Sequence, residues 1–206
     1  MTLMLAAASC ATGMWMNATF LMQGFLWTIL LIFGMGYLIY NVLNTGQPES
    51  VRITYLLAFA GLMGLQVGPF INAVLEIYPG LISQAALYTG TSFGTFSAVS
   101  LFSQRRSWLF LGGIIGNVLS AMAVYALISW FTGNVLGLGY VMVQLFITCC
   151  MIIYDTQVIV EQAERGRRDV PAHTLILFED LFRMFIQVVR ILIEMQENGN
   201  KNKKRR

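Results

Sequence analysis

Long apolar runs, separated by short polar segments, occupy most of this 206-residue chain. A helix needs about 20 predominantly apolar residues to cross the hydrocarbon core of a bilayer. The runs lie at residues 1–16, 20–42, 52–76, 81–102, 108–131, 135–160 and 174–195. The first run is short, and we expect it to begin inside what would normally be a fuller first helix, N-terminally truncated here. The pattern predicts an all-α membrane protein with six or seven transmembrane helices.

Composition supports this interpretation. The chain is 57% hydrophobic and 11% charged, with a mean hydropathy of +0.67, whereas about 25% of the residues in a soluble domain are charged. Residues 1–100 contain only three charged side chains, Glu49, Arg52 and Glu76. We therefore expect a single transmembrane helical domain over residues 1–196, followed by a basic cytosolic tail over residues 197–206.

The arginines outside the tail fall mostly in alternate loops. They follow the second, fourth and sixth apolar runs, at Arg52, Arg105, Arg106, Arg165, Arg167 and Arg168. Short loops rich in Lys and Arg face the cytosol in multi-pass proteins. The pattern predicts that these loops and the N-terminus are cytosolic.

The last apolar run, residues 174–195, does not fit a simple seventh crossing. Charged residues interrupt it, and a full crossing would carry the basic tail away from the cytosol, against the positive-inside rule. We favour a broken or re-entrant segment buried among the other helices, because irregular or polar backbone at depth needs protein or a cavity around it. A true seventh span remains the alternative.

Two aspartates lie in or next to apolar sequence, Asp155 at the end of the run GLGYVMVQLFITCCMIIY and Asp180 within TLILFEDLFRMFIQVV. An ionisable group at membrane depth is expensive, so it usually faces a bundle interior and marks a path for ions or protons. If the two meet, they titrate as a coupled unit, because carboxylates in contact cannot easily both ionise. Such a pair can share a proton or hold a calcium ion transiently.

Simpler roles exist for both aspartates. Asp155 could cap the cytosolic end of its helix in solvent. Asp180 could pair with Arg183 at i+3, a helix-surface contact worth a few tenths of a kcal/mol. The three cysteines have no framework spacing and there is one histidine, so we expect reduced cysteines, no zinc and no cofactor.

Several stretches together resemble the Bax inhibitor-1 family of membrane proteins. They are GLMGLQVGP (residues 61–69), QRRSWLFLGG (104–113), YDTQVIVEQAE (154–164) and the segment leading to Asp180. The resemblance runs through nearly the whole chain. It implies a bundle of six transmembrane helices around a central seventh, spanning or re-entrant helix.

The resemblance also implies a function. It indicates a pH-sensitive calcium leak out of the endoplasmic reticulum and suppression of apoptosis, with Asp155 and Asp180 as the pH-sensing pair. A basic residue near the second loop latches this pair in some relatives, and Arg52 is the candidate here. Calcium would be the permeant ion and protons the regulator.

The tail carries Lys203, Lys204, Arg205 and Arg206. A basic cluster beside a membrane segment binds anionic lipid headgroups, and the two lysines are also placed as in a dilysine signal for retrieval to the endoplasmic reticulum. Both roles need a cytosolic tail, and a purely topological charge is the alternative. We expect membrane lipid and calcium as partners, with death-regulating Bcl-family and calcium-release membrane proteins as further candidates, and no nucleic acid.

The sequence is also compatible with other functions. A non-conducting scaffold would bind cell-death or calcium-release proteins and use the aspartates only to hold the bundle together. A proton-coupled exchanger is a variant of the channel. An intramembrane aspartyl protease is disfavoured because the G-x-G-D half of its signature is missing at Asp180, which follows Leu177, Phe178 and Glu179. We therefore expect no enzymatic activity.

Overall fold

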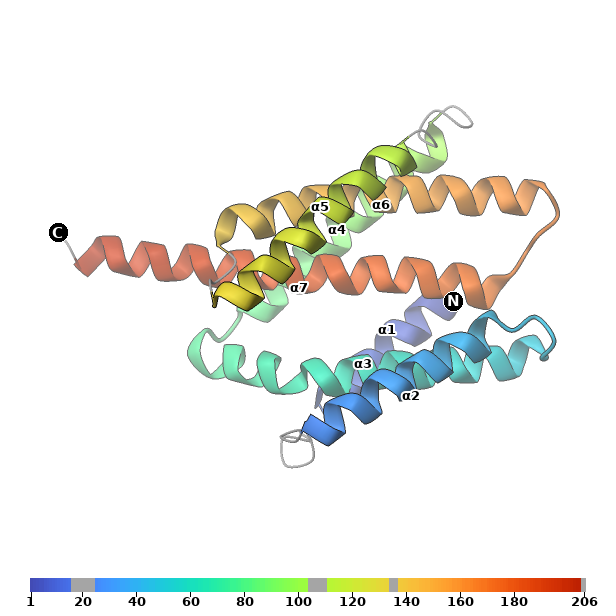
Figure 1. Ribbon diagram of the computed structural model, residues 1–206, viewed down its shortest axis with the longest axis horizontal. Helices are drawn as coiled ribbons and strands as arrows, with labels where there is room; N and C mark the ends of the chain where they lie inside the picture. Colours follow the sequence, from blue (N-terminus) through green and yellow to red (C-terminus); the bar gives the residue numbers. More distant parts are fainter. Residues whose placement is uncertain (16–24, 104–110, 134–136, 205–206) are drawn as a thin grey trace. The chain divides into compact units, whose positions relative to one another are not determined.

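The computed structural model describes residues 1–15, 25–103, 111–133 and 137–204. Seven helices and no strands occur in these ranges (Figure 1). The helices are α1 Thr2–Trp15, α2 Phe25–Leu43, α3 Glu49–Ile77, α4 Leu81–Phe102, α5 Leu111–Thr132, α6 Leu138–Glu164 and α7 Val170–Lys204. Each predicted apolar run corresponds to one helix, so the prediction of an all-α chain is confirmed.

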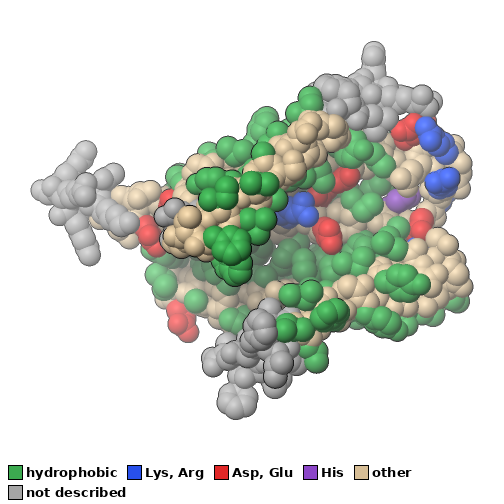
Figure 2. All heavy atoms as spheres, in the orientation of Figure 1, with side chains coloured by type: hydrophobic (Ala, Val, Ile, Leu, Met, Phe, Trp, Pro, Cys, Tyr) green, Lys and Arg blue, Asp and Glu red, His purple; other side chains and the backbone are tan. Residues whose placement is uncertain are grey.

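Three of the described helices are long and apolar enough to cross a membrane. They are Glu49–Ile77, Gly112–Thr132 and Leu138–Glu164, while Thr2–Met14 and Ile29–Leu43 are shorter apolar helices. Large apolar side chains also remain exposed, as the green surface in Figure 2 shows. On α5, for example, Leu127, Ile128, Trp130 and Phe131 are each more than half exposed. Such a surface suits contact with lipid tails better than contact with water.

The chain divides into two compact units. The first comprises Met1–Pro79 and Asp169–Phe178, and so contains α1, α2, α3 and the first turns of α7. Its core includes Leu56, Phe59 and Ala60 of α3. The ring of Phe59 meets that of Phe178 edge to face, with centroids 6.3 Å apart.

Glycines allow α1 and α3 to approach each other closely in this first unit. A Cβ atom on Gly64 would collide with the backbone carbonyl of Cys10, and one on Gly13 would collide with that of Gly61. Ser9 of α1 adds a hydrogen bond, donating its hydroxyl to the carbonyl oxygen of Leu57 at 2.8 Å. Gly64 belongs to a stripe of small residues in the sequence, and here that stripe serves tight helix packing.

The second unit comprises Gly80–Arg168 and Glu179–Arg206. In it α4 and α6 are joined through Ser100, whose hydroxyl donates to the carbonyl oxygen of Ile153 at 2.8 Å. Gln157 completes the link by donating from Nε2 to the carbonyl oxygen of Ser100 at 2.8 Å. Tyr125 of α5 stacks on Tyr140 of α6, with centroids 5.7 Å apart. These contacts set the position of α6, which carries Asp155.

The last helix corrects one prediction. We expected the apolar run 174–195 to be broken or re-entrant. It is not broken, because α7 is a single helix from Val170 to Lys204, and a re-entrant course stays a prediction. The run contains neither glycine nor proline, and its charges fit helical spacing, as Glu179 and Arg183 at i and i+4 illustrate with a separation of 4.0 Å. Charged side chains one turn apart support a helix rather than interrupt it.

The close approach of α1 and α3 predicts that Gly64→Ala destabilises the protein. The added methyl group meets backbone atoms that cannot rotate away, and overpacking of this kind costs about 1–3 kcal/mol. The measurement is the thermal unfolding midpoint in detergent. Gly116→Ala on α5 is the matched control because its added Cβ meets nothing within 4 Å. Equal midpoints for the two variants would contradict the packing described here.

Candidate functional site

The second unit brings Asp155 of α6 and Asp180 of α7 together. Their carboxyl groups lie close enough to act on each other electrostatically. Asp180 is deeply buried, with 2% of its surface exposed, and Asp155 is half-buried. We call these two residues the aspartate pair.

The aspartate pair needs a proton to be satisfied. Oδ2 of Asp180 is buried and has no hydrogen-bond donor among the described residues. Two ionised carboxylates can only accept hydrogen bonds, so neither can donate to the other. A proton shared between the two carboxyl groups supplies the missing donor and removes the repulsion between two buried negative charges. The arrangement can therefore hold either a proton or a cation.

Arg183, one turn along α7, is the basic residue beside the aspartate pair. Its charge acts on both carboxyl groups, while its ion-pair partner is Glu179, with 4.0 Å between Nη2 and Oε2. The Arg183 side chain is 41% exposed. It thus supplies partly screened positive charge to the pair, and the simple i+3 pairing between Asp180 and Arg183 is not the main contact of either residue.

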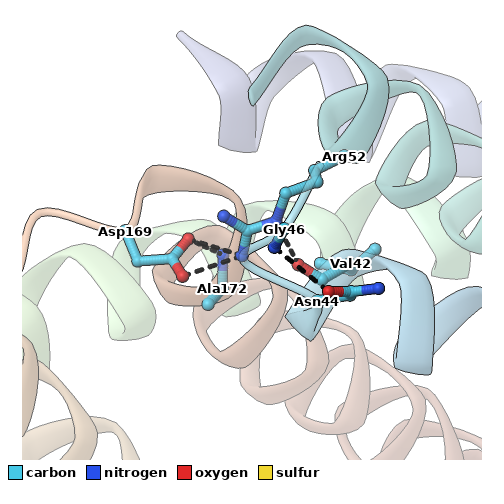
Figure 3. Close-up of polar contacts among 6 residues, drawn as sticks. All are labelled: Val42, Asn44, Gly46, Arg52, Asp169 and Ala172. Carbon is cyan, nitrogen blue, oxygen red and sulfur yellow. Dashed lines mark hydrogen bonds and ion pairs between the residues drawn. The ribbon is translucent and has the colours of Figure 1, made fainter. Parts of the chain in front are cut away.

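Arg52, the candidate latch, has a different partner (Figure 3). Its Nη2 donates to both carboxylate oxygens of Asp169, at 2.8 and 2.7 Å. Its Nε donates to the carbonyl oxygen of Val42 at 2.7 Å. We call this group the Arg52 clamp. All its members belong to the first unit, where they join the end of α2 and the start of α3 to the start of α7.

Asp169 has a second role, and sequence reasoning missed it. Its Oδ1 accepts a hydrogen bond from the backbone N–H of Ala172 at 3.2 Å, three residues on. This is the geometry of an N-cap, a position that favours aspartate. The sequence contained a sign of this N-cap, because Asp169 comes two residues before Pro171, and proline is tolerated in the first turn of a helix.

No metal site with three or more His, Cys, Asp or Glu side chains occurs in the part of the chain that the structure describes. Calcium takes six to eight oxygen ligands at a tight site. The aspartate pair offers at most two carboxylates, so water would complete the shell of a bound calcium ion. Such a site is suited to brief occupancy.

The predicted tail site is only partly described. Lys203 and Lys204 lie in the last turn of α7, but their side chains, and the whole of Arg205 and Arg206, lie outside the described residues. Lipid binding and retrieval by these four residues therefore remain predictions.

The Arg52 clamp predicts a strong effect on stability. Arg52→Gln or Asp169→Asn leaves a partly buried charge without its partner, so each lowers the free energy of unfolding by about 3 kcal/mol. The double variant costs less than the sum, with a coupling of about 0.5–3 kcal/mol. The measurement is equilibrium unfolding in mixed micelles.

The control for this prediction is Arg165→Gln. Arg165 also contacts a carboxylate, that of Glu161 at 2.6 Å, but its side chain is 65% exposed. Exposed pairs contribute about 0–1 kcal/mol. Strictly additive effects of Arg52→Gln and Asp169→Asn would show that the clamp does not couple the two residues.

The chain is similar to one family of known proteins and to several individual members of it. Residues 1–198 match the family described as inhibitor of apoptosis-promoting Bax1. The chain is 33% identical to Bax inhibitor 1 of Sus scrofa over 162 residues, which cover 78% of this chain and 68% of that protein. It is 33% identical to probable Bax inhibitor 1 of Paralichthys olivaceus over 187 residues, or 90% and 79% of the two chains. Bax inhibitor 1 of Oryza sativa subsp. japonica is 29% identical over 208 residues, or 100% and 82%.

Proposed function

Because the chain belongs to the Bax inhibitor-1 family, we propose that it is a pH-sensitive calcium leak channel of the endoplasmic reticulum membrane. By lowering the calcium content of the store, it suppresses apoptosis. Family membership implies a multi-pass membrane protein that regulates apoptosis. Calcium as the ion, the aspartate pair as the gate and the endoplasmic reticulum as the compartment are what we propose beyond family membership.

The observation that carries the proposal is the buried aspartate pair with its incomplete hydrogen bonding. Asp180 keeps one carboxylate oxygen without a donor among the described residues, although an unpaired buried polar group costs several kcal/mol. A purely structural pair would be expected to be fully satisfied. An incomplete pair retains the capacity to exchange a proton for a cation.

The gate works through competition between a proton and a cation. With one proton shared, a hydrogen bond holds the two carboxyl groups together. When the proton leaves, the two negative charges repel unless Arg183 or a calcium ion compensates them. Calcium held by only two carboxylate side chains and water is bound weakly, and conduction requires that an ion leave as readily as it enters.

The wider architecture is part of the same proposal. We place six helices across the membrane around α7, with the basic loops and the tail in the cytosol. The arginine-rich alternate loops support the cytosolic side of those loops. Lys203 and Lys204 would serve retrieval to the endoplasmic reticulum or, with Arg205 and Arg206, binding to anionic lipid.

Calcium flux tests the function. Purified protein in liposomes should release calcium at a rate that changes between about pH 5.5 and 8, because the two carboxyl groups of the aspartate pair titrate as one coupled unit. Asp155→Asn or Asp180→Asn should flatten this dependence, because a pair with one amide no longer shares a removable proton. Glu164→Gln, at an exposed carboxylate on the same helix as Asp155, is the control and should leave the profile unchanged.

The outcomes of the flux experiment separate the candidates. No flux from folded wild-type protein would overturn the channel and favour a non-conducting scaffold that binds cell-death or calcium-release proteins. If neither substitution changes the pH dependence of the flux, the protein is still a channel, but the aspartate pair is not its gate. Uphill calcium movement driven by a proton gradient would indicate an exchanger.

The position of the tail provides a separate prediction. An epitope added after Arg206 should be reached by antibody when only the plasma membrane of cells is permeabilised, because the basic tail is expected in the cytosol. Protection of the epitope until the reticulum membrane is also opened would mean that α7 crosses completely and that the tail lies in the lumen.

A further inference from the structure

One face of α7 carries a second buried polar side chain. Asp180, Met184 and Gln187 are all buried and follow one another at spacings of four and three residues. Side chains seven residues apart point in nearly the same direction, since an α-helix turns by about 100° per residue. Asp180 and Gln187 therefore lie on one face, about 10 Å apart along the axis. Val189, fully buried as well, lies on the opposite face.

Gln187 is buried without any partner. It is 3% exposed, and neither its Oε1 nor its Nε2 makes a hydrogen bond to any described residue. Buried side-chain amides in proteins almost always bond to protein or ordered water, because burying an amide without a hydrogen bond is energetically costly. A dry environment for Gln187 is therefore energetically poor.

Other unpartnered polar atoms occur in the same unit. Oδ2 of Asp180 is one, and Oγ1 of Thr156, next to Asp155 on α6, is another. All but one of the buried unpartnered side-chain atoms among the described residues belong to this second unit, and the exception is Oε1 of Gln47. A buried water needs two to four polar partners, and the amide of Gln187, with both its Oε1 and its Nε2 unpartnered, offers an acceptor and a donor.

We propose that Gln187 forms a second, hydrated cation position on the path that contains the aspartate pair, two turns of α7 away from it. Oε1 of Gln187 is a hard oxygen ligand of the kind that calcium accepts, and Nε2 orients the water that surrounds the ion. The apolar side chain of Met184 lies between Asp180 and Gln187 on this face and separates the two cation positions. Successive weak sites allow an ion to pass without being trapped.

The conducting part of this inference rests on the proposed channel function, while the hydration of Gln187 does not. The experiment therefore measures the two separately. The first arm compares Gln187→Cys with Val189→Cys in vesicles, using a small, positively charged, water-soluble methanethiosulfonate reagent. Mass spectrometry of peptides identifies the labelled cysteine, so Cys10, Cys149 and Cys150 can remain.

The two substituted positions are both buried but face opposite sides of α7. Cysteine at position 187 should react faster by on the order of tenfold or more, since a dry position reacts only in the rare locally opened molecules. Equal rates at the two positions, whether both slow or both fast, would overturn the hydrated site. This result does not depend on whether the protein conducts calcium.

The second arm measures calcium flux through liposomes containing Gln187→Leu. Removal of the amide should lower the flux several-fold without flattening its pH dependence, which belongs to the aspartate pair. Gln196→Leu is the matched control, because Gln196 is an exposed residue of the same helix. Normal flux through Gln187→Leu would overturn the cation position. Absence of flux from wild type would instead overturn the channel, and the labelling rates would still decide the hydration of Gln187.

Discussion

Apolar surroundings leave a polar group nothing to bond to except the protein itself and the few waters that the protein admits. For the backbone this constraint permits few solutions, and helices satisfy it within one segment. Every described secondary-structure element of this chain is a helix. The same constraint applies to side chains, where helix geometry cannot satisfy it. Each buried charge needs a partner on another segment. The Arg52 clamp meets this need fully, and the aspartate pair meets it only in part.

In the Arg52 clamp, both charges have partners. The guanidinium is buried and donates to a carboxylate and to a backbone carbonyl, while the carboxylate also caps the first turn of α7. Opposite charges and hydrogen bonds together offset the cost of removing both groups from water. The start of α7 is thus held to α2 and α3 by a contact that has a specific geometry. Such a contact is suited to fixing a helix end.

In the aspartate pair, the hydrogen bonding is incomplete. Two groups of the same charge meet, one carboxylate oxygen has no donor among the described residues, and the nearby Arg183 is partly exposed and paired with Glu179. What is missing can be supplied by a proton or a cation, and each can leave again. Gln187 repeats the situation two turns further along α7, with an amide in place of a carboxylate. Incomplete pairing costs stability, and the proposed exchange of protons and ions rests on it.

The Arg52 clamp and the aspartate pair also show how much of this structure could be predicted from the sequence. The helices and their approximate bounds follow from apolar run lengths, which are local features of the sequence. The residues alone left the meeting of Asp155 and Asp180 open, with simpler roles for each, and only the family resemblance implied that they form a pair. The expected break in the last run was wrong, because charges spaced by four residues pair along a continuous helix.

The partner of Arg52 could not be predicted in this way. Asp169 lies 117 residues away in the sequence, and its N-cap position gives no information about which guanidinium it binds. Nor could the sequence distinguish Gln187, a polar residue in an apolar run, from a glutamine at the surface. The sequence by itself determined that this chain forms apolar helices carrying a few costly charges. Only the tertiary structure decided which of those charges are satisfied, because pairing and burial depend on how helices distant in the sequence pack against one another.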